Sequence, residues 1–212
     1  MTATEKAAFE QPAHFEFDPA SEAEIAEWVA KYPPDKQASA VIPVLWVVQN
    51  QMKRLTGSAW VPLAAMDATA RRLNMAPIRV YEVATFYLMF NLRPIGRYHL
   101  QVCTTTPCWL RGSDEIVQAC RAATGIEAFG ETSTDGLFTM TEVECLGACV
   151  NAPILQVDDD FYEDMDGGRV VQLLDALRRG ERPQPGSMAG RQTSAPEGGP
   201  NTLTALDFAP GK

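Results

Sequence analysis

The chain has little positive charge and no long hydrophobic run. Its 18 Lys and Arg are outnumbered by 27 Asp and Glu, which gives a formal net charge of -9. Nucleic-acid binding depends on clustered basic side chains that neutralise phosphates, so no nucleic-acid partner is expected. No run of about 18 apolar residues is present, and a membrane-spanning helix needs that length, so we expect no direct membrane insertion.

The amino-terminal stretch lacks the features of a targeting sequence. MTATEKAAFEQPAHFEF has neither the apolar core of a signal peptide nor the Arg-rich, acid-poor composition of a transit peptide. The sequence therefore predicts a cytosolic protein, in a compartment where structural disulfides are rare. The cysteines number five, an odd count. We expect them to bind metal or to take part in redox chemistry rather than to form cross-links.

Motifs for nucleotide binding and for nucleophilic catalysis are also missing. No Gly-x-Gly-x-x-Gly follows an expected strand, no phosphate-binding loop is present, and no nucleophile has a base nearby. The chain is therefore not expected to bind NADH or to carry out hydride chemistry.

The first 93 residues have the periodicity of a small helical bundle. After an N-terminal extension over 1–18, four helices are expected over residues 21–32, 35–57, 61–74 and 76–90. Ser21 and Glu24 have the spacing of a capping box at the start of the first helix. Pro43 is expected to kink or restart the second helix, because proline removes a backbone donor. The sequence thus predicts a helical bundle over 19–93.

After Pro94 the hydrophobic pattern changes to strict alternation, which is typical of a half-buried strand. The expected order is strand, helix, strand, strand and helix, over residues 97–103, 113–125, 137–145, 153–158 and 167–180. This second domain is expected to span 94–180. Residues 181–212 contain five Pro and five Gly. That composition indicates a low-complexity, disordered tail.

Four cysteines form two tight pairs at the ends of expected strands. Four residues separate Cys103 from Cys108, three separate Cys145 from Cys149, and 36 lie between the pairs. Loops of this length let two thiolates converge on one metal ion. The spacing is compatible with structural zinc, with an iron–sulfur cluster or with a dithiol redox site, although neither pair has Cys-x-x-Cys spacing.

The residues around the thiols favour an iron–sulfur cluster. The Thr run at 104–106 supplies N–H groups and hydroxyls beside Cys103, and Gly147 lets the backbone approach closely between the other two thiols. Such donors stabilise the negative charge of a cluster. A Rieske centre needs two His ligands, and the two present, His14 and His99, are not spaced for that role.

Three segments together resemble a known family. They are CTTTPCWLRGS at 103–113, ECLGACVNAP at 144–153 and RVYEVATFYLMFN at 79–91. The resemblance is to the small iron–sulfur subunit of the NADH-oxidising module of respiratory complex I, NADH:quinone oxidoreductase. It covers residues 20–180. It implies an α+β protein, in which an N-terminal helical bundle precedes a thioredoxin-like α/β domain that carries one 2Fe-2S cluster.

The resemblance also implies a ligand set and partners. Cys103 and Cys108 would ligate one iron, and Cys145 and Cys149 the other. FMN and NAD would be bound by a partner subunit, because a one-electron centre cannot accept hydride. The chain would then act only as part of NADH:quinone oxidoreductase, beside the flavin-carrying NADH-binding subunit and a neighbouring iron–sulfur subunit. It would lie at the cytoplasmic face of a bacterial inner membrane, or on the matrix side in mitochondria.

Two other functions stay open at this point. The equivalent subunit of an NAD-dependent hydrogenase or formate dehydrogenase shares these motifs. A zinc-stabilised structural interaction module would use the same four thiolates for a different purpose. A visible spectrum separates these classes, because a zinc site is colourless.

Several residues near the pairs have simpler interpretations. Cys120 lies on an expected helix with apolar neighbours, and we interpret it as a buried core thiol rather than a ligand. Glu142 and Glu144 could lower the cluster's reduction potential, but we interpret them as solvated carboxylates. Trp109 could shield the site or face a partner. Pro153 precedes a strand where thioredoxin-like domains often have a cis-proline.

Overall fold

The structure is a computed structural model that describes residues 9–196, 198, 199, 201, 202 and 204. The chain divides into two compact units, with the boundary between Arg97 and Tyr98. The boundary follows closely on the change of hydrophobic period after Pro94. None of the helices in this described part is long and apolar enough to span a bilayer.

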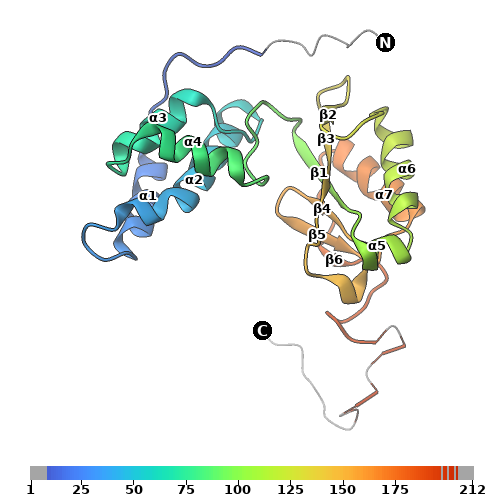
Figure 1. Cartoon of the computed structure of the whole chain (residues 1–212). Coiled ribbons are helices and arrows are strands. Elements are labelled where there is room, and N and C mark those ends of the chain that lie inside the picture. The colour runs from blue at the N-terminus through green and yellow to red at the C-terminus, as the bar shows by residue number, and fades with distance from the viewer. Residues whose placement is uncertain (1–8, 197, 200, 203, 205–212) are drawn as a thin grey trace. The chain divides into compact units, whose positions relative to one another are not determined.

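The first unit consists of helices, as predicted (Figure 1). They are α1 (Pro19–Ala30), the 3-10 helix η1 (Gln37–Ala40), α2 (Val41–Thr56), α3 (Leu63–Arg72) and α4 (Pro77–Phe86). Helix α2 is central and contacts α1, α3 and α4. It buries Val44, Leu45 and Val48 completely. A continuous apolar core therefore forms around α2.

The ends of these helices follow from local chemistry. Pro43 lies in the first turn of α2, directly after η1, so the helix restarts there as expected. The predicted capping box at Ser21 is wrong. Helix α1 begins two residues earlier, because the Asp18 carboxylate accepts the Ser21 N–H at 2.7 Å. The hydroxyl of Ser21 instead accepts a hydrogen bond from Arg54 at 3.0 Å.

The last helix of the bundle is shorter than predicted. Helix α4 ends at Phe86, and Tyr87 already has an extended conformation. The buried Gln49 side chain holds the segment that follows, since its amide donates to the Met89 carbonyl and accepts from the Asn91 N–H, at 3.2 and 2.9 Å. A long-range side-chain contact therefore replaces the last turn of the expected helix.

In its described residues, the second unit contains a six-stranded sheet with helices. Its elements are β1 (Tyr98–Cys103), α5 (Thr106–Leu110), α6 (Ser113–Thr124), β2 (Glu131–Thr132), β3 (Phe138–Val143), η2 (Cys149–Asn151), β4 (Leu155–Val157), β5 (Asp160–Glu163), α7 (Gly167–Arg178) and β6 (Gly186–Ser187). The strand order is β2-β3-β1-β4-β5-β6. Strands β1 and β3 are parallel, whereas β1 and β4 are antiparallel. The predicted α+β class is confirmed.

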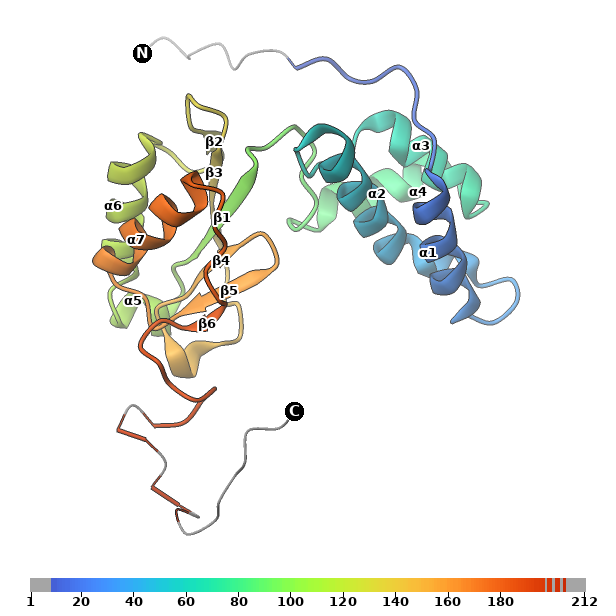
Figure 2. The same ribbon diagram turned by 180° about the vertical axis from the view of Figure 1, so that it is seen from behind.

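Helices α6 and α7 lie side by side against one face of the sheet (Figures 1 and 2). The main core of the unit lies between this face and the helices, where Leu100, Phe138 and Leu173 are fully buried. Side chains alternate between the two faces of a strand. Cys103, at the end of β1, accordingly belongs to a separate small apolar cluster with Cys108, Ala152 and Ile154.

The expected disordered tail is wrong for residues 183–195, which we call the strap. Strand β6 pairs in parallel with the edge strand β5, and the Met188 N–H donates to the Glu163 carbonyl at 2.9 Å. Pro183 accepts a hydrogen bond from the Tyr162 hydroxyl at 3.0 Å. The composition is rich in Pro and Gly, but the unpaired edge of β5 supplies backbone partners that composition cannot reveal.

Candidate metal centre

The first cysteine pair is buried at the end of the central strand. Cys103 is the last residue of β1, and Cys108 lies in the short helix α5 that follows. Each is only 1% exposed. The Thr105 hydroxyl lies 3.2 Å from the Cys103 Sγ. The strand and the short helix thus hold both thiols in a dry, apolar environment.

The second pair lies on a more exposed loop. Cys145 follows β3, and Cys149 begins η2. Their Sγ atoms are 3.1 Å apart. Gly147, between them, has a φ of 83°, a left-handed conformation that glycine adopts without steric cost. This turn brings the two thiols together.

Sheet topology brings the two pairs close. In the parallel ladder of β1 and β3, Cys103 is the partner of Val143, so the loops after both strands leave the same edge. The loops also interlock, because the Leu146 N–H donates to the Cys103 sulfur and the Cys103 N–H donates to the Ile154 carbonyl at 3.3 Å. The negative charge of a Cys103 thiolate also contributes to raising the pKa of Cys149, so these two side chains lie near each other. The fold therefore places the two cysteine loops side by side at one edge of the sheet.

The thiols of each pair have opposite pKa shifts. Burial would raise the pKa of Cys103, but hydrogen bonds from the Thr105 hydroxyl and the Leu146 N–H outweigh it and lower that pKa. Burial and the hydrogen bond to Cys103 raise the pKa of Cys108 to about 12. The two shifts together favour a thiolate at Cys103 and a protonated thiol at Cys108 that donates a hydrogen bond to it.

The exposed pair has the same asymmetry. The hydrogen bond from Cys149, followed by that of the Gly147 N–H, lowers the pKa of Cys145. The same contact raises the pKa of Cys149. One thiol of each pair, Cys103 or Cys145, is therefore favoured as the thiolate, which is the form that binds metal.

Backbone N–H groups donate to all four sulfurs, and for Cys149 the donor is its own N–H. The N–H groups of Thr105 and Leu146 donate to Cys103, that of Ile154 to Cys108, and that of Gly147 to Cys145. Thr105 and Gly147 lie within the motifs that the sequence singled out. Leu146 and Ile154 were missed, and no sequence signal could have identified them, because every residue except proline has an N–H group.

These residues fit a 2Fe-2S cluster. Four cysteine side chains are available as ligands, and N–H donors offset the charge of anionic sulfurs. Two sulfurs about 2.3 Å from one tetrahedral metal lie about 3.8 Å apart. The 3.1 Å pair at Cys145 and Cys149 therefore needs only a small side-chain adjustment to ligate one iron.

The remaining candidates lie around the pairs. Cys120 is fully buried in the main core with apolar neighbours, and burial raises its pKa to about 12, so it is a core thiol as expected. The Thr104 hydroxyl donates to Glu142 at 2.6 Å. Glu144 is exposed. The Ala152–Pro153 peptide bond is cis, which confirms the expectation for Pro153.

Exposed apolar residues flank the thiols in the chain, and we call them the apolar rim. It consists of Trp109, Leu110 and Val150, which follow the ligand candidates Cys108 and Cys149 directly in the chain. The three rim residues are 58%, 70% and 60% exposed. Large apolar side chains that are exposed beside a site mark a surface that a partner can cover.

Comparison with known proteins points the same way as the geometry. Residues 25–178 match the family of thioredoxin-like [2Fe-2S] ferredoxins. One NADH-quinone oxidoreductase subunit, from Rickettsia conorii, is 47% identical over 165 residues, which cover 78% of this chain and 95% of that protein. The corresponding subunit from Rickettsia bellii is 46% identical over a stretch of the same length.

A solved structure shares the fold. A crystal structure of NAD+-reducing [NiFe]-hydrogenase in the air-oxidized state superimposes with a TM-score of 0.53 at 18% sequence identity. The match covers 64% of this chain and 23% of that one. The family match spans both cysteine pairs, and the fold that surrounds them has its counterpart in a known structure. The chain thus belongs to the thioredoxin-like [2Fe-2S] ferredoxin family.

Proposed function

We propose that this chain is the small 2Fe-2S subunit of NADH:quinone oxidoreductase and exchanges single electrons with FMN on a partner subunit. Its cluster ligands are Cys103 and Cys108 on one iron, and Cys145 and Cys149 on the other. The observation that carries the proposal is the convergence of two cysteine loops at adjacent parallel strands, with N–H donors aimed at the sulfurs. Relatives at 46–47% identity are named as subunits of NADH-quinone oxidoreductase.

The chain's own residues bind and tune the group. A 2Fe-2S cluster, when bound, supplies a one-electron acceptor and donor. The thiolates hold it, and the apolar cluster around Cys103 and Cys108 excludes water from that side. The N–H groups of Thr105, Leu146 and Gly147 donate to anionic sulfur and so raise the reduction potential, which the exposed Glu142 and Glu144 oppose.

A zinc-stabilised structural module would use the same four thiols. The match of residues 25–178 to thioredoxin-like [2Fe-2S] ferredoxins supports an iron–sulfur cluster over zinc. The visible spectrum of the purified chain separates the two, because a zinc site is colourless.

A hydrogenase assembly remains a second candidate, because the NAD+-reducing [NiFe]-hydrogenase structure has a similar fold. The identity of the co-purifying subunits separates the two. Copurification with a quinone-reducing assembly supports the first proposal, whereas copurification with a nickel-containing subunit supports the second.

The flavin-carrying NADH-binding subunit is the proposed partner of the apolar rim, and a neighbouring iron–sulfur subunit completes the contacts of the chain. Electron exchange needs the flavin and the cluster to lie close together. Trp109, Leu110 and Val150 are exposed apolar side chains beside the thiols in the chain, and a partner subunit can cover them. In this assembly the chain would lie at the cytoplasmic face of a bacterial inner membrane, or on the matrix side in mitochondria.

The test uses the purified full chain. It should be brown, contain equimolar iron and sulfide, and give a 2Fe-2S electron paramagnetic resonance signal after reduction by dithionite. It should remain oxidised when mixed with NADH alone, because the chain has no nucleotide-binding motif. Addition of the flavin subunit should allow reduction by NADH. A colourless protein with stoichiometric zinc, or NADH oxidation by this chain alone, would refute the proposal.

A further inference from the structure

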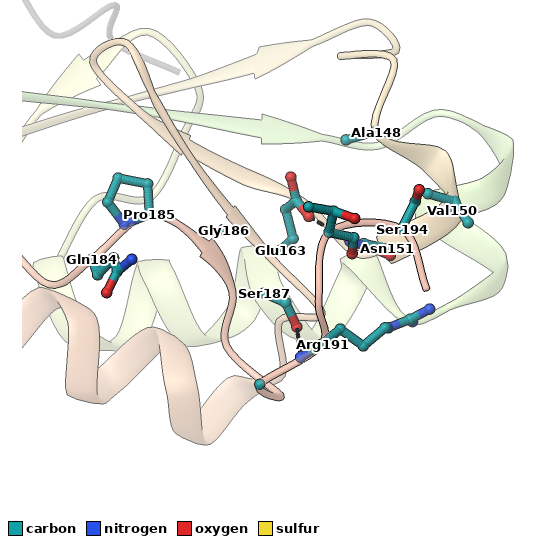
Figure 3. Close-up of a pocket in the computed structure, with 12 residues that line it drawn as sticks. Ala148, Val150, Asn151, Glu163, Gln184, Pro185, Gly186, Ser187, Arg191 and Ser194 are labelled. Carbon is teal, nitrogen blue, oxygen red and sulfur yellow. Dashed lines mark hydrogen bonds between the residues drawn. The ribbon is translucent and has the colours of Figure 1, made fainter. Parts of the chain in front are cut away.

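The strap passes directly beside the loop that holds the second cysteine pair (Figure 3). Strap residues and the η2 segment line a common cavity of about 710 Å³, with Glu163 of β5 between them. Polar contacts beside this cavity connect the strap to η2 and to the end of β5.

The first of these contacts is made by Asn151, two residues after Cys149. Asn151 is only 2% exposed. Its Nδ2 donates to the Glu163 carboxylate at 2.6 Å and to the Thr193 carbonyl of the strap at 2.8 Å. The side chain at the end of η2 is thus clamped between strand β5 and the strap.

The second contact is a buried ion pair. Arg191 of the strap donates through Nη2 and Nε to the two carboxylate oxygens of Asp164, at 2.6 and 3.1 Å. Both side chains are nearly buried, at 11% and 7% exposure. Ser187 adds a hydrogen bond to the same carboxylate at 2.6 Å. A two-point guanidinium–carboxylate contact fixes orientation as well as distance.

Asp164 links this ion pair to the cysteine loop. Its N–H donates to the Asn151 carbonyl at 2.7 Å, and the next N–H, of Met165, donates to the Pro153 carbonyl at 3.1 Å. The backbone on which Asp164 sits therefore also holds both ends of the turn after Cys149. Loss of the Arg191 side chain would therefore affect that turn through Asp164, which contacts both.

We propose that the strap is a positioning element for the second cysteine pair. Arg191, through Asp164, and Thr193, through Asn151, hold η2 in place and thereby fix Cys149. The inference rests on the proposed 2Fe-2S function. It goes beyond the family match, because that match ends at residue 178, before the strap begins. Partners behind metal ligands commonly control both the affinity and the electronic properties of a metal site.

The chain provides a matched control in Arg182. It donates to Asp160 at 2.7 Å and to Asp158 at 3.3 Å. The Asp158 side chain is 6% exposed, close to the 7% of Asp164. Asp158 pairs with the start of β1, since its N–H donates to the His99 carbonyl, whereas Cys103 lies at the other end of that strand. Arg182→Ala therefore removes an arginine–carboxylate ion pair far from the thiols along β1, although the Arg182 side chain is more exposed than that of Arg191, at 42% against 11%.

The experiment compares full-length wild type, Arg191→Ala, Arg191→Lys and Arg182→Ala. We expect Arg191→Ala to lose iron to a chelator about tenfold faster than wild type. Its reduced 2Fe-2S resonance signal should be shifted or broadened, and its reduction potential changed. Arg191→Lys should recover part of the difference, because lysine restores the charge but not the two-point contact. Arg182→Ala should match wild type in all three measurements, even if its melting temperature falls.

Amide hydrogen exchange of the iron-free proteins gives a readout independent of the cluster. The amides of Asn151 and Ala152 should exchange faster in Arg191→Ala than in Arg182→Ala. Equal behaviour of the two alanine variants in iron loss, resonance signal and amide exchange would overturn the positioning role while leaving the proposed function intact. A wild-type chain that holds no 2Fe-2S cluster would overturn both.

Discussion

At the scale of single residues, the four paired thiols differ in burial and in acidity. Cys103 and Cys108 are shielded from water, whereas Cys145 is exposed and Cys149 partly so. Cys120 has the same side chain but is fully buried among apolar residues, and it serves as core. Spacing alone does not separate a ligand from a core thiol. The environment that each thiol meets in the fold determines its chemistry.

Replacement of any one paired cysteine by serine should weaken or abolish the cluster, because serine oxygen is a poor substitute for thiolate on iron. Cys120→Ser should keep the cluster and lose only about 1–3 kcal/mol of stability, the cost of a hydroxyl in an apolar core. Iron and sulfide content and the resonance spectrum measure the first effect, and thermal unfolding measures the second. A Cys120→Ser protein without iron would refute the ligand assignment.

Thiol alkylation of the iron-free chain should follow the pKa shifts. The lowered pKa of Cys145 gives it more thiolate near pH 8 than a thiol of ordinary pKa, and it is exposed. Cys120, with its pKa raised to about 12, stays protonated and buried at that pH. Mass spectrometry after brief treatment with iodoacetamide should find Cys145 modified before Cys120. Preferential modification of Cys120 in the folded chain would contradict this ranking.

At the scale of elements, strand β1 and the loops after β1 and β3 create the site. Helix α6 lies against β1, and α7 packs on α6, so the position of Cys103 depends on a well-buried scaffold. On the side of Cys149, the strap and β5 contact the end of η2 through Thr193 and Glu163 instead. The two halves of the site therefore have different mechanical supports, and variants can affect one without the other.

Removal of residues 183–212 should lower the melting temperature, contrary to what composition alone suggests. The truncation removes β6 and leaves the buried Asp164 carboxylate without Arg191. Loss of one partner from a buried ion pair typically costs about 3–5 kcal/mol. Differential scanning calorimetry of the two iron-free chains makes the comparison. An unchanged melting temperature would show that the strap does not stabilise the unit.

The start of helix α1 offers a pH-dependent test. Hydrogen bonds from the Ser21 N–H and then from Arg54 lower the pKa of Asp18. Its contribution is therefore present above the ordinary pKa near 3.8 and is lost as the pH falls through the lowered value. Asp18→Ala should lower the melting temperature by a few degrees at pH 7 and by less at pH 3. An equal loss at both pH values would contradict the capping role.

At the scale of the whole molecule, the chain combines an electron-transfer unit with a helical unit that bears exposed apolar residues. Phe86 and Leu88, at and just beyond the end of α4, are 76% and 90% exposed. Burial of such side chains is favourable, so this surface is expected to contact a partner subunit. The helical unit is thus expected to serve as a docking element.

Leu88→Glu should weaken binding to the flavin-carrying subunit while leaving the iron content unchanged, because a charged side chain resists desolvation in an interface. Leu55→Glu, on α2, is the matched control, since Leu55 is also exposed, at 65%. Pull-down and titration calorimetry with the flavin subunit provide the measurement. Equal affinities of the two variants would rule out a special role for this surface.

Local signals were sufficient to predict most helices and strands and to select the ligand candidates. The spacing of the four thiols, the change of period after Pro94 and the restart at Pro43 depend on residues close together in the chain. Gly57 and Gly125 likewise end α2 and α6 in left-handed conformations that side chains rarely adopt. Helix ends, strand periodicity and ligand spacing depend on residues close together in the chain, so they can be predicted before the fold is known.

The tertiary structure alone decided which backbone groups face the sulfurs and what holds the second loop. The N–H groups of Leu146 and Ile154 reach Cys103 and Cys108 only because separate loops meet at one sheet edge. Arg191 finds Asp164, 27 residues away, because β5 is an edge strand that accepts the strap. Such contacts depend on strand order and on backbone groups common to most residues, so no local pattern in the sequence encodes them.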